Sequence, residues 1–432
     1  MTLITTKPRP AVRRLAFSRL ISLVGTHAAF IALIFAVYQQ TGSTTWVSFA
    51  MIATFAGAGI STPFGGALGD RFDRRRVLIL SDVLGALTFG VLAFAHHPGA
   101  MIALIFVGEV VASPSFPAIE AAVPNLAGEE QLAWANGMIG FGRNMGSMVG
   151  PVLGGALVAL NGPGLVFWVN AASFALSAIL VWSVRGRFSE ERTTDGDHMG
   201  LRAGFVYVAH DRILRAVTLA WMVLLLGVGT VIVAELPLAQ SFGLGATGYG
   251  LLATSWGVGA VFGTLLATRM RERQERPGLF LGTVGPAVGF GLVSVLPWFG
   301  GILGSVGFAG GTDAVSTVAF QNIAQRRTPD AVRSRVMGAI DAIVTGGLAL
   351  SFVAAGPFVA AVGPRGAYLA AGISSLIGGA VLFPALWGRR SERAEPGSVA
   401  TESAVAIQTA VAVEAAIAAP DVATAEADVA PA

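Results

Sequence analysis

The segment from Gly66 to Arg76 reads Gly66-Ala-Leu-Gly-Asp70-Arg71-Phe-Asp73-Arg74-Arg75-Arg76. It joins the end of an apolar run, rich in small residues, to a cluster of arginines. Small residues allow two helices to approach closely inside a membrane. Asp70 stands at the boundary of the apolar run, where a carboxylate can meet a helix N-terminus or an arginine. The stretch therefore indicates the end of one membrane span, a short charged loop and the start of the next span.

The chain on either side of this stretch is too apolar for a water-soluble protein. Of its 432 residues, 54% are hydrophobic and 12% are charged, whereas a soluble domain has about 25% charged residues. Half the usual charge cannot cover the surface of a soluble globule, so this composition excludes a soluble enzyme. It also excludes disorder for most of the chain. The absence of cysteine excludes disulfides, thiolate catalysis and cysteine-bound metal.

Apolar runs of membrane-spanning length recur along the chain. A membrane helix needs about 20 mostly apolar residues, and twelve such runs are separated by turn-like breaks such as Thr41-Gly-Ser43 and Gly363-Pro-Arg-Gly366. The runs are approximately 16–38, 45–68, 77–96, 100–121, 136–159, 164–184, 216–238, 247–268, 278–298, 301–324, 336–360 and 366–387. We therefore expect an all-α polytopic membrane protein.

Positive charge falls almost entirely on one side of these spans. Of the 28 lysine and arginine residues, 25 lie in alternate connections and at the two termini. These clusters occupy 7–14, 71–76, 185–215, 269–276, 326–335 and 389–393. Because basic loops stay in the cytoplasm, both termini are predicted to be cytoplasmic. The basic character thus reflects membrane topology, and no nucleic-acid partner is expected.

The two halves of the chain resemble each other at an offset of about 200 residues. Gly57-Ala-Gly59 corresponds to Gly257-Val-Gly259, and Gly150-Pro151 corresponds to Gly356-Pro357. A repeat of six spans in the same orientation predicts a two-lobed secondary transporter. The predicted units are an N-terminal lobe (1–184), a cytoplasmic linker with a short amphipathic helix (185–215), a C-terminal lobe (216–388) and a disordered cytoplasmic tail (389–432).

The segment from Gly66 to Arg76 resembles the Gly-x-x-x-Asp-Arg-x-Gly-Arg-Arg signature of the major facilitator superfamily. Asp73 stands where the family often has glycine. The resemblance covers roughly residues 14–388 and implies twelve helices in two pseudo-symmetric lobes of six. It also implies a cytoplasmic gate, in which the stretch latches one lobe to the other. The gate residues are Gly66, Asp70, Arg71, Arg74, Arg75 and, near the inner end of the fourth span, Glu120.

Glycines recur at every fourth position of the fifth span, and a proline interrupts it. Such a pattern gives one smooth helix face and a kink. It looks like the antiporter motif of drug-exporting branches of the superfamily, although an ordinary tight helix pair is an alternative. The motif comprises Gly146, Gly150, Pro151, Gly154 and Gly155. The segment Ser113–Asn125 is similar to the branch that contains macrolide-efflux and enterobactin-exporter proteins.

Ionisable residues lie near the middle of three spans. A charge in the bilayer is costly, so such residues are candidates for function. In the superfamily, spans 1, 4, 7 and 10 line the central cavity, and His27, Glu109 and Asp313 lie on three of these. A carboxyl group in hydrocarbon favours its protonated form and is able to exchange a proton or pair with a cationic drug. The alternative is a buried polar group that binds a neighbouring helix.

Five further charges accompany these candidates. Arg143 and Asp341, each about two turns into its span, either pair and shape the gate or have a structural role. We expect Asp82 to support the arginine cluster at 71–76, and Arg19 and Glu235 to reach the membrane interfaces.

Together these features predict an exporter of amphipathic small molecules of the drug or antibiotic class. The predicted mechanism is proton antiport by alternating access in the cell membrane, with protons, substrate and lipid as partners and a monomer as the functional unit. A siderophore or metabolite exporter or permease is the alternative, and a non-transporting sensor or scaffold is an alternative of another class. No enzymatic activity, cofactor or metal is expected.

Overall fold

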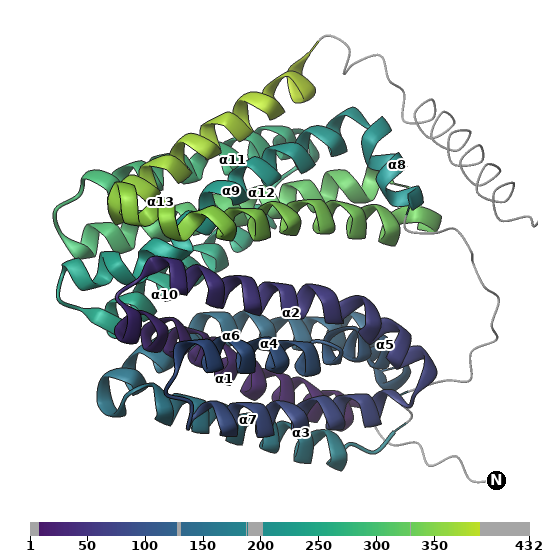
Figure 1. Cartoon of the computed structure of the whole chain (residues 1–432). Helices are drawn as coiled ribbons and strands as arrows, with labels where there is room; N and C mark the ends of the chain where they lie inside the picture. Colours follow the sequence, from purple (N-terminus) through teal and green to yellow (C-terminus); the bar gives the residue numbers. More distant parts are fainter. Residues whose placement is uncertain (1–7, 128–130, 187, 189–201, 329, 389–432) are drawn as a thin grey trace, which may run out of the picture.

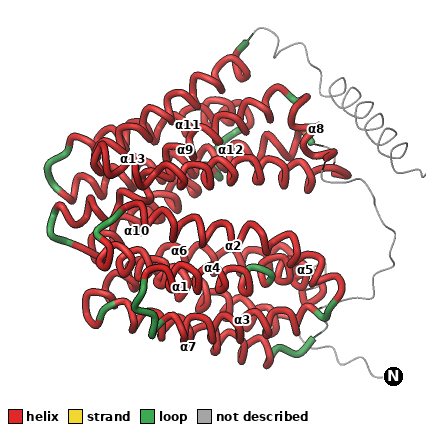
Figure 2. Tube along the Cα trace, viewed as in Figure 1, coloured by secondary structure: helices red, strands yellow, loops and turns green. Residues whose placement is uncertain are grey.

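The computed structural model describes residues 8–127, 131–186, 188, 202–328 and 330–388, and within them all the regular structure is helical (Figure 2). The helices in chain order are α1 (Pro8–Thr41), α2 (Thr44–Arg71), α3 (Arg74–Leu92), α4 (Pro98–Ala112), α5 (Ser115–Ala127), α6 (Leu132–Asn161), α7 (Pro163–Ser183), α8 (Arg202–His210), α9 (Arg212–Ser241), α10 (Gly245–Ala267), α11 (Glu272–Val295), α12 (Phe299–Arg327) and α13 (Asp330–Trp387). The predicted tail, 389–432, lies outside the described residues.

Two glycine-proline pairs turn the chain in the same way in both halves. Gly162 (φ 76°, ψ 176°) precedes Pro163 between α6 and α7, and Gly363 (φ 73°, ψ 170°) precedes Pro364 inside α13. Positive φ favours glycine because it lacks a Cβ atom, and proline fits the first turn of the helix that follows. Helix α13 therefore consists of two spans that meet at Gly363, and the repeat inferred from the sequence extends to backbone geometry.

The described helices provide twelve membrane passes. Eight stretches are long and apolar enough to cross a membrane, and one of them, Val336–Trp387, contains both spans of α13. Another, Pro98–Ile119, combines α4 with the start of α5. Helices α3, α6 and α12, with 19, 30 and 29 residues, complete the bundle. The predicted twelve-helix architecture is confirmed. The short helix α8 precedes the second half, as expected for the linker.

The helices form two lobes, α1–α7 and α8–α13 (Figure 1). We call the end of the bundle that holds the arginine clusters the Arg-rich end. It carries Arg13, Arg14, Arg74, Arg75, Arg76, Arg212, Arg215, Arg326 and Arg327. Near this end each lobe has its own hydrophobic core, around Leu15 in one and Leu214 in the other.

Toward the opposite end a single core continues from lobe to lobe. It includes Val47 and Met51 of α2 together with Phe352 and Ala355 of α13. The lobes therefore meet at the end away from the arginines and diverge toward the Arg-rich end, as Figure 1 also shows. This arrangement positions every candidate functional residue below.

Candidate functional site

Helices α2 and α13 form the first half of the contact between the lobes. The hydroxyl of Thr44 donates a hydrogen bond to the carbonyl oxygen of Gly356 (2.7 Å). One turn of helix earlier in α13, Phe352 stacks on Phe55, with ring centroids 5.2 Å apart. A methyl group on Gly356 would lie 2.5 Å from the Cα atom of Thr45. The glycine thus allows the two backbones to touch.

Helices α6 and α10 form the second half of this contact. The carbonyl oxygen of Pro151 would lie 2.4 Å from a methyl group on Gly250. A methyl group on Gly155 would lie 2.6 Å from the carbonyl oxygen of Ala246. The glycine-proline pair Gly356-Pro357 of α13 and the pair Gly150-Pro151 of α6 therefore both lie at inter-lobe contacts. We call the α2–α13 and α6–α10 contacts together the seam.

The glycine stripe of α6 serves a second contact, inside the first lobe. A methyl group on Gly146 would lie 2.7 Å from the Cβ atom of Leu23, and one on Gly154 would lie 2.5 Å from the carbonyl oxygen of Ala28. One on Gly150 would lie 2.6 Å from the Cβ atom of His27. The predicted antiporter-like motif therefore packs α6 on α1 through one face and on α10 through another, and His27 lies at the α1–α6 crossing.

Glu109 lies inside the first lobe. Together with Arg19 it lines a small cavity among α1, α3, α4, α5 and α7. Helix α2 closes this region, because a methyl group on Gly57 would lie 2.8 Å from the Cβ atom of Glu109. Arg19 donates to the hydroxyl of Ser115 (3.2 Å) and its guanidinium lies 5.2 Å from the ring centroid of Phe116. A cation and a carboxyl group thus share one enclosed cavity.

Asp82 belongs to the same interior. Its carboxylate accepts a hydrogen bond from the hydroxyl of Ser177 in α7 (2.7 Å) and interacts with Arg19. Asp82 and Arg19 are only 2% and 5% exposed. The expectations that Asp82 supports the arginine cluster and that Arg19 reaches the interface are therefore wrong. Both side chains are buried because α1, α3 and α7 pack together around them.

Asp313 is the candidate of the second lobe. It is partly buried on α12, a helix that packs closely on α10 and α11. Methyl groups on Gly263 and Gly285 would lie 2.0 and 2.5 Å from atoms of Gly311 and Thr312, respectively. Among the described residues no hydrogen bond or ion pair links Asp313 to Glu109 or His27. The three candidates lie on three different helices, α1, α4 and α12.

Arg143 and Asp341 lie on α6 and α13, the two helices that carry the glycine-proline contacts of the seam. Both side chains are exposed, and no ion pair between them is present in the part of the chain that the structure describes. The predicted pairing is thus not present in this arrangement of the lobes.

A polar cluster at the other end of the second lobe is not indicated by the sequence. Glu235 of α9 interacts electrostatically with Tyr249 of α10 and Tyr368 of α13. Both phenols are at most 1% exposed, and neither hydroxyl has a hydrogen-bond partner among the residues that the structure describes. Glu235 is partly buried, so the expectation that it reaches the membrane interface is also wrong. Only the rarity of tyrosine, with four in the chain, hinted at these positions.

The predicted gate lies at the Arg-rich end of the first lobe. The side chains of Asp70, Arg71 and Glu120 and the surroundings of Gly66 lie outside the described part of the structure. Asp73 caps α3 by accepting a hydrogen bond from the backbone N–H of Arg76 (3.2 Å). Arg74 is buried and donates to the carbonyl oxygen of Phe188 (3.4 Å), and Arg75 donates to that of Trp182.

The Arg-rich end of the second lobe has an ion-pair network that the sequence did not reveal. Asp211 is 1% exposed, caps α9 through the N–H groups of Ile213 and Leu214, and pairs with Arg327 (2.9 Å). The hydroxyl of Tyr207 donates to the carbonyl oxygen of Arg327 (2.7 Å). Burial, then the charge of Asp211, raises the pKa of the Tyr207 phenol, so the phenol keeps its donor proton at neutral pH.

Nothing in the described residues gathers three or more metal-binding side chains. The Arg326 guanidinium pairs with the buried carboxylate of Glu275. The chemistry available inside the bundle is therefore that of carboxyl groups and of the buried Arg19 guanidinium.

The chain is similar to known transporters along most of its length. A family model described as the Major Facilitator Superfamily matches residues 15–235 and 217–420. The protein named enterobactin exporter EntS from Shigella boydii serotype 18 is 26% identical over 408 residues, which cover 92% of this chain and 97% of that protein. The proteins of the same name from Escherichia coli and Escherichia fergusonii have the same identity and coverage.

Solved structures show the same fold. A bacterial homologue of the human lysosomal transporter Spinster, in an inward-facing and occupied conformation, matches with a TM-score of 0.73 at 13% identity, over 90% of this chain and 100% of its own. A bacterial homologue of the iron transporter ferroportin, in an inward-facing state, matches with a TM-score of 0.68 at 17% identity, over 89% and 100%.

Proposed function

The chain belongs to the major facilitator superfamily and is a multi-pass membrane transporter, not an enzyme, and from that premise we propose that it exports a siderophore-type small molecule in exchange for protons. The observation that carries this proposal is the similarity to enterobactin exporters, which spans both lobes and the seam between them. This similarity favours the siderophore alternative over the drug or antibiotic class expected from the sequence.

The arrangement of the lobes suits the loading step of an exporter. If the Arg-rich end faces the cytoplasm, as the distribution of basic residues predicts, the lobes diverge toward the cytoplasm and are closed at the outer end by the seam. A substrate made in the cell enters from that side. We place the protein in the inner membrane with both termini cytoplasmic, and we infer that it functions as a monomer.

We propose that Glu109 carries the exchanged proton in the first lobe. Protonated Glu109 is neutral, and Arg19 keeps its hydrogen bond to Ser115. Loss of the proton leaves an anion in the same small cavity as the Arg19 guanidinium, and this anion attracts Arg19 in competition with Asp82. Because Arg19 and His27 belong to the same helix, this attraction acts on α1 and hence on its glycine-lined contact with α6.

Helix α6 then transmits the change to the second lobe. Its Gly154 contacts α1 and its Gly155 contacts α10, so a shift at the first contact alters the second. Asp313 is the proposed carrier of the second lobe. Arg143 and Asp341, exposed on α6 and α13, are proposed to approach each other only when the Arg-rich end closes.

The gate is proposed to act at the Arg-rich end. Gly66, Asp70 and Arg71 with Glu120 would latch the lobes when that end closes. In the present arrangement Arg75 instead donates to a carbonyl of its own lobe. We expect Asp70→Asn and Arg71→Ala to slow turnover without affecting membrane insertion. Normal transport in both variants would contradict the gate assignment.

Export of lipophilic antibiotics is the second candidate, because the glycine stripe of α6 looks like the motif of drug-exporting branches. The test of both is transport by the full chain in proteoliposomes, with enterobactin and a panel of lipophilic antibiotics under an imposed proton gradient. Gradient-driven movement of enterobactin supports the proposal. Movement of antibiotics alone would replace it with drug efflux, and movement of no compound would favour a sensor or scaffold.

A further inference from the structure

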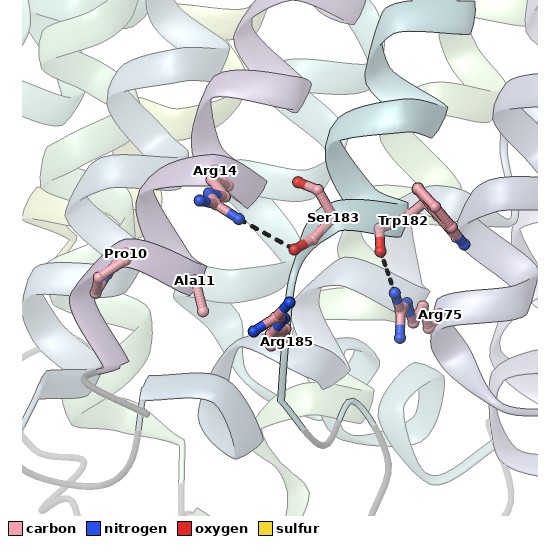
Figure 3. Close-up of a pocket in the computed structure, with 7 residues that line it drawn as sticks. All are labelled: Pro10, Ala11, Arg14, Arg75, Trp182, Ser183 and Arg185. Carbon is pink, nitrogen blue, oxygen red and sulfur yellow. Dashed lines mark hydrogen bonds between the residues drawn. The ribbon is translucent and has the colours of Figure 1, made fainter. Parts of the chain in front are cut away.

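A basic pocket lies at the Arg-rich end of the first lobe, and Figure 3 shows the residues that line it. It lies between the start of α1, the start of α3 and the end of α7. Three arginines line it, namely Arg14, Arg75 and Arg185, together with Trp182 and Ser183. We call it the α1–α3–α7 pocket.

Backbone carbonyls orient two of the three guanidinium groups. Arg14 donates to the carbonyl oxygen of Ser183 (3.1 Å), and Arg75 donates to that of Trp182, as Figure 3 shows. The Arg75 guanidinium also lies 6.0 Å from the ring centroid of Phe188. A carbonyl group fixes the direction of a guanidinium but leaves its charge in place, and each guanidinium has five N–H donors. Most of those donors remain available to a ligand.

The charge of this pocket is not neutralised within the described residues. No carboxylate there lies within ion-pair distance of Arg14, Arg75 or Arg185. Two arginines at the same end of the second lobe, Arg326 and Arg327, differ because they pair with buried carboxylates. The uncompensated charge of the α1–α3–α7 pocket therefore points to an anionic ligand.

The pocket lies at the end of a membrane span, which is where lipid headgroups are expected. Trp182 is the penultimate residue of α7, whose 21 residues form a membrane span, and tryptophan is typical of the membrane interface. Leu176, Ile179 and Trp182 follow one another at intervals of three residues and are 44%, 60% and 68% exposed. They form an apolar track that leads from the hydrocarbon region to the pocket.

We propose that the α1–α3–α7 pocket binds the phosphate headgroup of an anionic phospholipid, with an acyl chain along the track on α7. Arginine binds phosphate through paired N–H donors, and basic pockets between membrane helices bind such headgroups. The apolar track selects a lipid over a soluble anion. The three helices all belong to one lobe, so the bound lipid stabilises that lobe without requiring the lobes to separate.

The experiment measures binding of phosphatidylglycerol to the purified full chain in detergent, by native mass spectrometry and by thermal unfolding, with phosphatidylcholine for comparison. The test variants are Arg185→Gln, whose side chain is exposed and has no hydrogen bond or ion pair within the described residues, and the double variant Arg14→Gln/Arg185→Gln. The matched control is Arg271→Gln/Arg273→Gln, which removes two exposed arginines from the same end of the second lobe.

Phosphatidylglycerol is expected to bind and to raise the unfolding temperature of the unmodified chain and of the control. Each arginine removed from the pocket should weaken this binding about fivefold, because a basic residue near an anionic lipid surface contributes about 1 kcal/mol. Arg14→Lys/Arg185→Lys should retain most of the effect. Equal weakening in the control would overturn the proposal in favour of diffuse attraction. An equal thermal shift with inorganic phosphate would overturn it in favour of a soluble anion.

Discussion

Two adjacent glycines of α6 allow the seam to be tested separately from the packing of one lobe. A methyl group on Gly155 would lie 2.6 Å from the carbonyl oxygen of Ala246 in the other lobe. A methyl group on Gly154 would lie 2.5 Å from the carbonyl oxygen of Ala28 in the same lobe. Gly155→Ala therefore opposes the present arrangement of the lobes, whereas Gly154→Ala opposes the folding of the first lobe in any arrangement.

The expected magnitude follows from the clash distances. Both contacts are shorter than ordinary van der Waals separation and involve backbone atoms, which cannot rotate away. Overpacking of this kind costs about 1–3 kcal/mol. In Gly155→Ala this energy disfavours the arrangement in which the seam is closed. The equilibrium constant between that arrangement and the one with a closed Arg-rich end changes about 5- to 150-fold. For Gly154→Ala it lowers the free energy of unfolding instead.

The assay is a distance measurement between spin labels at the Arg-rich end. The chain has no cysteine, so labels attach only at introduced positions, such as Arg76→Cys and Arg271→Cys, which are exposed in different lobes. Gly155→Ala should enrich the shorter distance, which reports a closed Arg-rich end. Gly154→Ala should leave the distance distribution unchanged and lower the unfolding temperature. An unchanged distribution in Gly155→Ala, or an equal shift in both variants, would refute the reasoning.

Three further predictions concern single side chains. Asp211→Ala should lower the free energy of unfolding in detergent by about 3 kcal/mol, because it removes the cap of α9 and leaves Arg327 without its buried partner. Asp211→Asn keeps the cap and should lower the free energy of unfolding by less. Thr44→Val should weaken the seam by about 1 kcal/mol, since its hydrogen bond to Gly356 is lost, and the spin-label distances should shift in the same direction as in Gly155→Ala. Tyr368→Phe should leave the thermal stability unchanged or raise it, because the deleted hydroxyl is buried without a hydrogen-bond partner in the described structure. A clear loss of stability would show that the hydroxyl makes a hydrogen bond to water or to Glu235.

The fold followed from the sequence because membrane helices obey strong local rules. Spans of apolar residues and turns such as Gly363-Pro364 are visible without tertiary information, and the arginine clusters indicate which ends lie together. Even the role of the α6 glycines as a close-packing face was predictable. What the spacing could not show is that Gly154 and Gly155, one residue apart, contact helices in different lobes.

The charged residues were less predictable, since a helix has several faces and the sequence does not say what covers each one. Asp82 and Arg19 are separated by 63 positions, yet α1, α3 and α7 bury them together. Glu235 gains its tyrosine neighbours from α10 and from the second span of α13. Such pairings depend on which helices pack together, and a single sequence carries no signal for them.

The division of the chain at 184/185, 215/216 and 388/389 and the roles of Glu109, Asp313 and His27 stay predictions. The geometry adds one distinction among them. Glu109 shares an enclosed cavity with a guanidinium group, whereas Asp313 and His27 have no charged partner in the described structure. The Glu109 carboxyl is therefore the candidate on which the account of proton coupling depends most.

Proton antiport can be measured as proton flux in proteoliposomes when enterobactin is added, with a pH-sensitive dye as the readout. The full chain and the control Glu272→Gln, which alters an acid whose side chain is 82% exposed, should both show substrate-driven flux. The double variant Glu109→Gln/Asp313→Asn should show none while remaining folded in the membrane. Undiminished flux in the double variant would contradict the assignment of these carboxyl groups as proton carriers. Transport of enterobactin by the full chain without any proton flux would contradict proton antiport itself.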